Sequence, residues 1–271
     1  MTQQNFFLSI IEKFVRSNLY LFIFFRYITN KFFTKYIFES DFKILKILKQ
    51  KKYFADMNKP IIDIGANDGI SYKTIRNFIK KTKIISFEPQ KNKFSQLKIL
   101  KKKDSNYKIF NCGLSKKKKL MKLYIPFFNN TSLSPFAGLN KKEVISRLNQ
   151  SIFVKKLLNK IIFKSFDIKL KKLDDYKFKP SFVKIDVEGH EYECIQGSIK
   201  TIKKNKPILL VEYNDLSNKK ILKLLKQFNY SSYYFNSKNY KIIKHKKEKI
   251  FNIFYIDKKK AEIIQNKNDF N

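Results

Sequence analysis

Few residues of this chain are suited to disulfide bonds or to metal binding. Its 271 residues include two cysteines, Cys112 and Cys194, and no C-x-x-C pair. Two cysteines do not make a disulfide framework and are typical of buried thiols in a reducing compartment. With His190 and His245 as the only histidines, a structural zinc site is not expected and no metal is assigned. We therefore expect a cytoplasmic protein that depends on its hydrophobic core.

Arginine is scarce although the chain is strongly basic. The formal net charge is +37, yet arginine occurs only at Arg16, Arg26, Arg76 and Arg147. Dedicated phosphate-binding proteins favour arginine forks interleaved with aromatic residues in one patch, whereas these lysines are spread along the whole chain. We interpret the charge mainly as biased composition and solvated helix faces. A nucleic-acid partner is not expected, and a preference for anionic lipid, glycan or nucleic acid stays open.

No apolar run is long enough to span a membrane. Residues 6–38 are apolar and aromatic, but basic residues interrupt them before the roughly 20 apolar residues that a span requires. No small-residue cleavage site follows, which argues against a cleavable signal peptide. We expect residues 1–58 to form an N-terminal helical extension that packs on the core or on a second subunit. The alternative is a basic amphipathic segment on a membrane surface. The oligomeric state is not determined by the sequence.

The stretch over residues 60–89 carries the clearest functional signal. It reads PIIDIGANDG, then a segment with helical character over residues 71–81, then KIISFEP. The β-branched runs predict buried parallel strands at residues 61–64 and 84–87. A strand, a glycine loop, a helix and a second strand tipped with a carboxylate are typical of a nucleoside-cofactor half-site.

The glycine loop favours a positively charged ligand over a dinucleotide. A dinucleotide fingerprint has glycine where this chain has Asn67, and an acidic residue, Asp63, stands two positions before Gly65. A carboxylate there would repel a diphosphate, but it suits the ammonium and sulfonium of S-adenosylmethionine. Glu88 would then hold the ribose, and a nicotinamide-dependent oxidoreductase fits least. The candidate cofactor-binding residues are Asp63, Gly65, Ala66, Asn67, Gly69, Glu88 and Pro89.

A third strand extends the candidate cofactor site. The pattern predicts a helix over residues 92–103 and a strand over residues 107–112, which ends in the loop NCGLS. The loop after this strand lies along the adenine edge in adenosyl sites, so Asn111 and Gly113 are further candidates. A simple strand-to-turn signal is the alternative.

Residues 116–180 depart from the alternation of strands and helices. Residues 120–125 alternate like an edge strand, residues 166–170 are a possible antiparallel partner, and a helix is expected over residues 141–160. An insertion at this point lies above the carboxyl ends of the sheet, so we interpret it as a lid and substrate-recognition element. Three hydroxyl side chains either reach the site or cap a turn: Thr131, Ser132 and Ser134.

A second group of polar residues follows the fourth predicted strand, residues 182–187. The segment DVEGHEYECIQG places Asp186, Glu188, His190 and Glu191 at the strand end and the start of the next helix. Early carboxylates favour helix initiation, but three acids and a histidine in six residues exceed that need. Their crowding could poise a proton acceptor, so Asp186, Glu188 and His190 are the candidate catalytic residues.

The last third of the chain completes the predicted sheet. A fifth strand over residues 207–213 ends in Glu212, Asn214 and Asp215, which could converge with Asp186 on a hydroxyl substrate or a divalent metal; we leave both open. The remaining pattern predicts a helix over residues 217–228, an antiparallel strand pair over residues 230–235 and 250–256, and a frayed polar tail over residues 258–271.

Taken together, these segments resemble the FkbM-type family of S-adenosylmethionine-dependent methyltransferases. The matching segments occur in the family's order between about residues 59 and 214: IDIGANDG, FEP, NCGLS, LKKLDDY, FVKIDVEGHEYECIQG and PILLVEYN. The resemblance implies an α/β class I Rossmann-like fold over residues 59–257. Its sheet would be mostly parallel and seven-stranded, with an antiparallel final strand.

The resemblance also implies a function. It implies O-methylation of a hydroxyl, commonly on a sugar or a polyketide, with Asp63, Gly65, Asn67, Gly69 and Glu88 at the cofactor. Asp186 and Glu188 would be active-site acids, and His190 occupies a variable position of the motif. The expected acceptor is a glycan or a small molecule. Two alternatives remain: an RNA or DNA methyltransferase, against which the absence of an N-P-P-Y clamp argues, and a membrane-peripheral binding module that keeps the fold.

Overall fold

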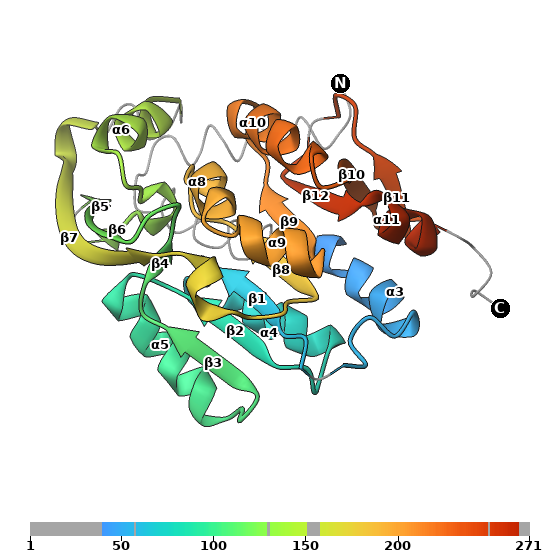
Figure 1. Cartoon of the computed structure of the whole chain (residues 1–271). Coiled ribbons are helices and arrows are strands. Elements are labelled where there is room, and N and C mark those ends of the chain that lie inside the picture. Colours follow the sequence, from blue (N-terminus) through green and yellow to red (C-terminus); the bar gives the residue numbers. More distant parts are fainter. Residues whose placement is uncertain (1–39, 57, 129–130, 151–157, 249, 266–271) are drawn as a thin grey trace, which may run out of the picture.

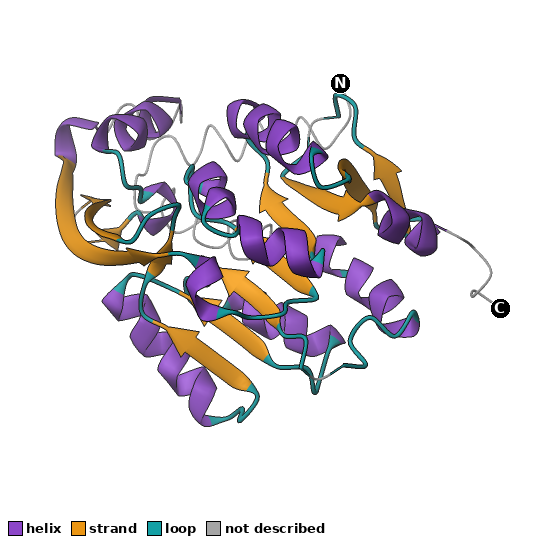
Figure 2. Cartoon of the chain, in the orientation of Figure 1, coloured by secondary structure: helices purple, strands orange, loops and turns teal. Residues whose placement is uncertain are grey.

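The computed structural model describes residues 40–56, 58–128, 131–150, 158–248 and 250–265. In this part of the chain, helices flank a central sheet, and a smaller second sheet stands beside it at the left of the view (Figure 1, Figure 2). The aromatic segment at residues 6–38 lies outside the described residues. None of the helices formed by the described residues has the length and apolar character of a membrane span.

The main sheet has eight strands in the order β11-β10-β12-β9-β8-β1-β2-β3. Strands β3, β2, β1, β8 and β9 run parallel, and β12 is antiparallel to both of its neighbours. All residues of β1, β2 and β8 are buried, which explains why their sequences are mostly continuous apolar runs. In chain order the strands are β1 (Ile61–Ile64), β2 (Ile84–Phe87), β3 (Tyr107–Phe110), β8 (Phe182–Ile185), β9 (Ile208–Glu212), β10 (Tyr230–Asn236), β11 (Lys241–Lys244) and β12 (Asn252–Asp257).

Helices bury the two faces of this sheet in separate hydrophobic clusters. Apolar residues of α3, α4 and α11 pack with Ile61 in one cluster, and those of α8, α9 and α10 pack with Ile62 in the other. Consecutive strand residues point to opposite faces, so this division is expected. The helices are α3 (Ile44–Gln50), α4 (Ile70–Phe78), α5 (Lys91–Lys102), α8 (Glu191–Gln196), α9 (Ile199–Asn205), α10 (Asp215–Lys226) and α11 (Lys258–Gln265).

The order of the strands brings the two polar segments together. β1 lies between β2 and β8, so the direction in which the chain adds strands reverses between β1 and β8. Ligands of open parallel sheets bind outside the carboxyl ends of the strands at such a point. The register places Asp63 opposite Ser86 on one side and opposite Lys184 on the other. The glycine loop after β1 and the acidic segment after β8 are therefore neighbours, as the sequence predicts.

The insertion forms the second sheet, in the order β4-β7-β5-β6. Its two long strands pair antiparallel over their full length, which confirms the predicted pairing but extends both strands. Of the predicted helix over residues 141–160, α6 covers Lys141–Gln150, residues 158–160 form a short 3-10 helix, and residues 151–157 lie outside the described residues. The elements are β4 (Gly113–Leu114), β5 (Lys119–Phe128), β6 (Thr131–Ser132), α6 (Lys141–Gln150) and β7 (Ile161–Lys171).

The structure differs from the sequence prediction in two places near the β11 edge of the main sheet. All seven predicted strands are present, and β11 adds an eighth at the edge, where its short sequence KIIK gave little signal. Residues 258–265 do not form the frayed tail that the sequence predicts. They form α11, whose Ala261 and Ile264 are buried in the same cluster as Ile44 and Leu48 of α3. Both helices therefore belong to the main core.

Candidate active site

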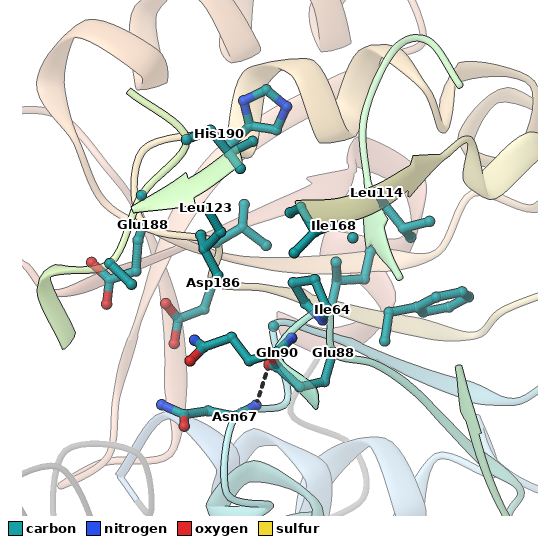
Figure 3. Close-up of a pocket in the computed structure, with 18 of the residues that line it drawn as sticks. Ile64, Asn67, Glu88, Gln90, Leu114, Leu123, Ile168, Asp186, Glu188 and His190 are labelled. Carbon is teal, nitrogen blue, oxygen red and sulfur yellow. Dashed lines mark hydrogen bonds between the residues drawn. The ribbon is translucent and has the colours of Figure 1, made fainter. Parts of the chain in front are cut away.

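A pocket lies at the carboxyl ends of β1, β2 and β8, where the second sheet covers them (Figure 3). In Figure 3 the carboxyl groups of Asp186 and Glu188 lie on one side, and Leu114 and Ile168 lie on the other. Of the residues singled out from the sequence, nine line the pocket: Gly65, Asn67, Glu88, Pro89, Gly113, Ser134, Asp186, Glu188 and His190. Four of the predicted cofactor residues do not line it: Asp63, Ala66, Gly69 and Asn111.

The backbone of the loop after β1 requires its glycines. Gly65 has φ +78°, and a Cβ there would lie 1.8 Å from the carbonyl oxygen of Asp186. Gly69 has φ +83°, and a Cβ there would lie 2.5 Å from a side-chain carbon of Leu100. Asn67 also has a positive φ, 48°, which asparagine tolerates better than most residues. Gly69 therefore shapes the loop without lining the pocket.

Glu88 is the buried acceptor at the tip of β2. Its Oε2 accepts a hydrogen bond from the Asn67 backbone N–H at 2.9 Å, and its Oε1 accepts one from Gln90 at 2.8 Å. Burial raises the pKa of this carboxyl to about 7, against the two backbone hydrogen bonds. The side-chain oxygens of Asn67 and Gln90 are buried and have no hydrogen-bond partner among the described residues. These acceptors at the pocket suit a ligand that carries hydroxyl and amino groups.

Asn111 supports the Glu88 tip from outside the pocket. Its Nδ2 donates to the backbone oxygens of Glu88 at 2.9 Å and of Pro89 at 3.2 Å. The sequence predicts that Asn111 contacts the ligand, whereas in the structure its side chain binds the backbone of Glu88 and Pro89. Gly113 does line the pocket, and a Cβ there would lie 2.6 Å from the Leu170 side chain of the second sheet.

Asp63 does not face the pocket, which corrects the expectation that its carboxylate meets a cationic ligand directly. The residue is 0% exposed, and its Oδ2 accepts hydrogen bonds from Ser71 Oγ at 2.6 Å and from Ser86 Oγ at 3.3 Å. Its Oδ1 lies 3.4 Å from Lys184 Nζ. The negative charge of Asp63 is therefore matched inside the protein.

Lys184 is the first of two site residues that the sequence reasoning missed. Its side chain is 4% exposed, and Nζ lies 3.3 Å from Asp186 Oδ2 and donates to the Gly65 carbonyl at 3.0 Å. Burial disfavours its charge, but Asp186 and Asp63 outweigh burial and raise the pKa of Lys184, so the ammonium stays charged. One cation thus connects β1, the glycine loop and the end of β8. A lysine inside the apolar run FVKI, in register with Asp63, was the available signal.

The insertion contributes a second cation, Arg147 of α6. Its Nη1 donates to Glu188 Oε2 at 2.8 Å, and its Nη2 donates to the Ala137 carbonyl at 3.1 Å. Burial and the neighbouring Asp186 raise the pKa of Glu188 to about 8, and Arg147 opposes the rise. Glu188 also has φ +56°, in the left-handed region. The sequence reasoning missed Arg147 because its partner lies 41 positions away.

His190 completes the polar side of the pocket. Its Nε2 lies 2.9 Å from Ser115 Oγ, and its Nδ1 lies 3.6 Å from Glu193 Oε2. Burial lowers the pKa of His190, although Glu193 opposes this effect. The imidazole is therefore mainly neutral at pH 7 and can accept a proton.

The acids after β9 do not join the pocket as a group. Burial and Asp186 raise the pKa of Glu212 to about 9, so this carboxyl is protonated at pH 7. Asn214 caps α10 by accepting from Leu216 and Ser217, and Asp215 accepts from the Tyr213 hydroxyl at 2.5 Å. No group of His, Cys, Asp or Glu side chains in the described part of the chain is arranged to hold a metal ion.

The sheet and the pocket together define a class of protein. A mostly parallel sheet that reverses its strand order between β1 and β8, with antiparallel β12 inserted between β9 and β10, is the class I methyltransferase fold. The polar pocket lies at its reversal point, with Glu88 at the tip of the second strand. The chain belongs to the Methyltransferase FkbM domain family, whose sequence model matches residues 63–232. It is therefore a methyltransferase, and the match includes the insertion.

Solved structures with a similar fold are distant in sequence. The methyltransferase FkbM of Methylobacillus flagellatus KT is 15% identical with a TM-score of 0.46, and the match covers 73% of this chain and 43% of that one. The precorrin-6y C5,15-methyltransferase of Geobacter metallireducens GS-15 is 10% identical with a TM-score of 0.36 over 76% of this chain and 84% of that one. An rRNA methylase of Streptococcus thermophilus is 10% identical with a TM-score of 0.37 over 78% and 96%. No curated protein matches the chain.

Proposed function

We propose that this protein transfers a methyl group from S-adenosylmethionine to a hydroxyl oxygen of a glycan or a related small molecule. The observation that carries the proposal is the pairing of two kinds of group in one pocket. Glu88 offers a buried carboxyl to a ribose, and His190, a neutral imidazole, lines the same pocket as Asp186 and Glu188. A hydroxyl acceptor needs such a proton acceptor because it is a poor nucleophile until its proton leaves.

The residues present fit the cofactor. Glu88 has spare acceptor capacity for ribose hydroxyls, and the unpaired side-chain oxygens of Asn67 and Gln90 can accept from amino groups. Gly65 lines the pocket, and its lack of a Cβ makes room for the Asp186 carbonyl. The carboxylate of Asp186 at the pocket favours a cation in an otherwise basic protein. When bound, S-adenosylmethionine supplies an electrophilic methyl group on its sulfonium.

The residues of the chain then have separate roles. Asp186 accepts a hydrogen bond from the substrate hydroxyl and orients its oxygen, and Lys184 holds the Asp186 carboxylate in place. Because the hydroxyl has a single proton, the group that accepts this hydrogen bond is also the one that takes the proton. His190, whose Nε2 lies 2.9 Å from Ser115 Oγ, is the alternative acceptor. Leu123, Ile168 and other apolar residues of the second sheet restrict water on the opposite wall.

Two variants separate cofactor binding from turnover. Glu88→Ala should weaken the binding of S-adenosylmethionine in calorimetry by at least tenfold, because it removes the ribose acceptor. Asp186→Asn should leave this affinity within about threefold and reduce turnover about 100-fold, within the range for a positioned catalytic group. Unchanged affinity in the Glu88 variant would refute the cofactor assignment, and retained turnover in the Asp186 variant would refute the role of Asp186.

The acceptor is identified by transfer of label. The protein is incubated with donor labelled in the methyl group and with separate fractions of cell glycans, lipids and RNA. Label in the glycan or small-molecule fraction that withstands conditions cleaving methyl esters supports the proposal. Label in RNA alone would favour the nucleic-acid alternative, which the scarcity of arginine and the absence of an N-P-P-Y clamp argue against.

A further inference from the structure

A second hollow lies at the opposite end of β1 and β8 from the pocket. It is bordered by the turn after α3, by Pro180 and Ser181 before β8, by the end of α9 and by α11. Ser181 N–H donates to the Pro60 carbonyl at 3.1 Å, which fixes the start of β8 beside the start of β1. The hollow is therefore part of the rigid core and not a feature of one loop.

Lysine dominates the lining of this hollow. The lining contains six lysines, one aspartate and no arginine, so this surface is strongly positive. We call it the lysine hollow, and its lysines are Lys51, Lys52, Lys59, Lys179, Lys204 and Lys260. These lysines come from four separate segments of the chain. The hollow is therefore not simply the exposed face of one lysine-rich helix.

The lining of the lysine hollow holds six lysines and a single carboxylate. Asp56 is its lining carboxylate, and it lies 3.6 Å from Lys59 Nζ. Lys260 is half-buried and donates to the backbone oxygens of Asn205 and Lys206. Its pKa is lowered by burial and by nearby lysines, against the attraction of Asp257. An anion in the hollow would relieve this repulsion between ammonium groups.

From these observations we infer that the lysine hollow docks the protein on an anionic membrane surface by accepting lipid phosphate groups. Lysine acts as a point charge suited to delocalised attraction, whereas nucleic-acid sites use arginine forks and stacked aromatic residues, of which this lining has only Tyr53. Ile263, 52% exposed on the rim, offers an apolar contact of the kind that peripheral proteins insert between headgroups.

The position of the hollow fits this partner. Lys51 and Lys52 follow the end of α3, and Lys59 lies two residues before the start of β1. The methyltransferase pocket opens at the other end of β1 and β8. Docking through the lysine hollow would leave the pocket accessible to an acceptor from the solvent side.

Vesicle sedimentation with the full chain tests the inference. The protein should bind vesicles that contain phosphatidylglycerol and should not bind vesicles of pure phosphatidylcholine. A triple variant, Lys59→Gln with Lys179→Gln and Lys204→Gln, removes three exposed charges from the hollow. Each lysine near an anionic surface changes affinity about fivefold, so the expected loss is on the order of 100-fold.

A matched variant controls for diffuse attraction by the net charge. Lys219→Gln, Lys220→Gln and Lys223→Gln remove the same charge from exposed positions on α10 and should weaken binding less than about fivefold. Circular dichroism checks that both variants are folded. Equal losses in the two variants, or no vesicle binding by the full chain, would overturn the inference. Binding of inorganic phosphate in calorimetry without vesicle binding would assign the hollow to a free anion instead and would also overturn it.

Discussion

The two walls of the methyltransferase pocket are built in different ways. The wall from the main sheet holds its charges in buried contacts, such as those of Lys184 with Asp63 and Asp186. The wall from the insertion is apolar at Leu123, Ile168 and Leu170, and its one charged contact to the main sheet among the described residues joins Arg147 to Glu188 at partly exposed positions. The first wall is therefore fixed before a ligand binds, and the second can vary with less cost to the fold.

The largest expected effect tests the rigidity of the main-sheet wall. Lys184→Met leaves the buried carboxylate of Asp63 without its cation, so the free energy of unfolding should fall by about 3–5 kcal/mol. Urea unfolding measures the change. Adding Asp63→Asn to this variant should restore part of the loss, because the buried charge is then removed as well. If Lys184→Met is as stable as the parent, the ion pair between Lys184 and Asp63 does not stabilise this part of the fold.

A pair of glycine variants separates steric contact from backbone strain. Gly65→Ala and Gly189→Ala both place a Cβ at a positive φ, so Gly189→Ala should lose about 1–3 kcal/mol of stability and Gly65→Ala should lose more. The Cβ at position 65 would also meet the Asp186 carbonyl at 1.8 Å, whereas at position 189 the nearest atom is Glu143 Oε2 at 3.9 Å. Calorimetry should therefore show loss of cofactor binding for Gly65→Ala only. An equal loss of cofactor binding in both variants would show that the contact of the new Cβ with the Asp186 carbonyl is not the cause.

The raised carboxyl pKa values predict how stability depends on pH. The pKa values of Glu188 and Glu212 are about 8 and 9, against 4.5 for an ordinary glutamate. Between pH 7 and 9 the folded chain therefore holds protons that the unfolded chain has released, and stability is lost as pH rises. The free energy of unfolding should fall by about 2 kcal/mol across this range, mostly through Glu212, which keeps its proton over most of it. Glu212→Gln should flatten this slope, and an unchanged slope would reject the buried acid.

The smallest effect on stability is expected at the insertion wall. Arg147→Met breaks the contact with Glu188, but both side chains are partly exposed, so the loss should stay below about 1 kcal/mol. Removing the cation should raise the pKa of Glu188 and move the pH profile of methyl transfer to higher pH. Lys122→Met breaks the exposed contact with Asp167 on the same sheet and should change neither quantity. If the pH profile of Arg147→Met is not shifted, the protonation state of Glu188 does not affect the rate of methyl transfer.

The sequence predicted the main sheet and the place of the site because those signals are local. The apolar runs of β1, β2 and β8 are short and buried on both faces, and Gly65 and Glu88 follow their strands directly. The position of each strand end was therefore predictable. The orientation of Asp63 was not, since it depends on Lys184 in a strand more than 100 positions later.

The remaining parts depend on contacts that no local pattern records. β4 and β6 have two residues each, too few for a periodic signal. Arg147 belongs to a helix whose pattern indicates only an amphipathic surface, and its contact with Glu188 depends on how α6 is placed opposite the segment after β8. The polar sequence of α11 predicted a tail, but two residues on one face, Ala261 and Ile264, were enough to dock it on the core.

Gly138 has a consequence that reaches beyond its own position. A Cβ there would lie 2.5 Å from Nη2 of Arg147, the movable end of a long side chain. Gly138→Ala would therefore displace the guanidinium and leave the fold intact, so the environment of Glu188 could be retuned from fifty positions away. A single added methyl group at this position would thus change the cation beside Glu188 without replacing any charged residue of the pocket.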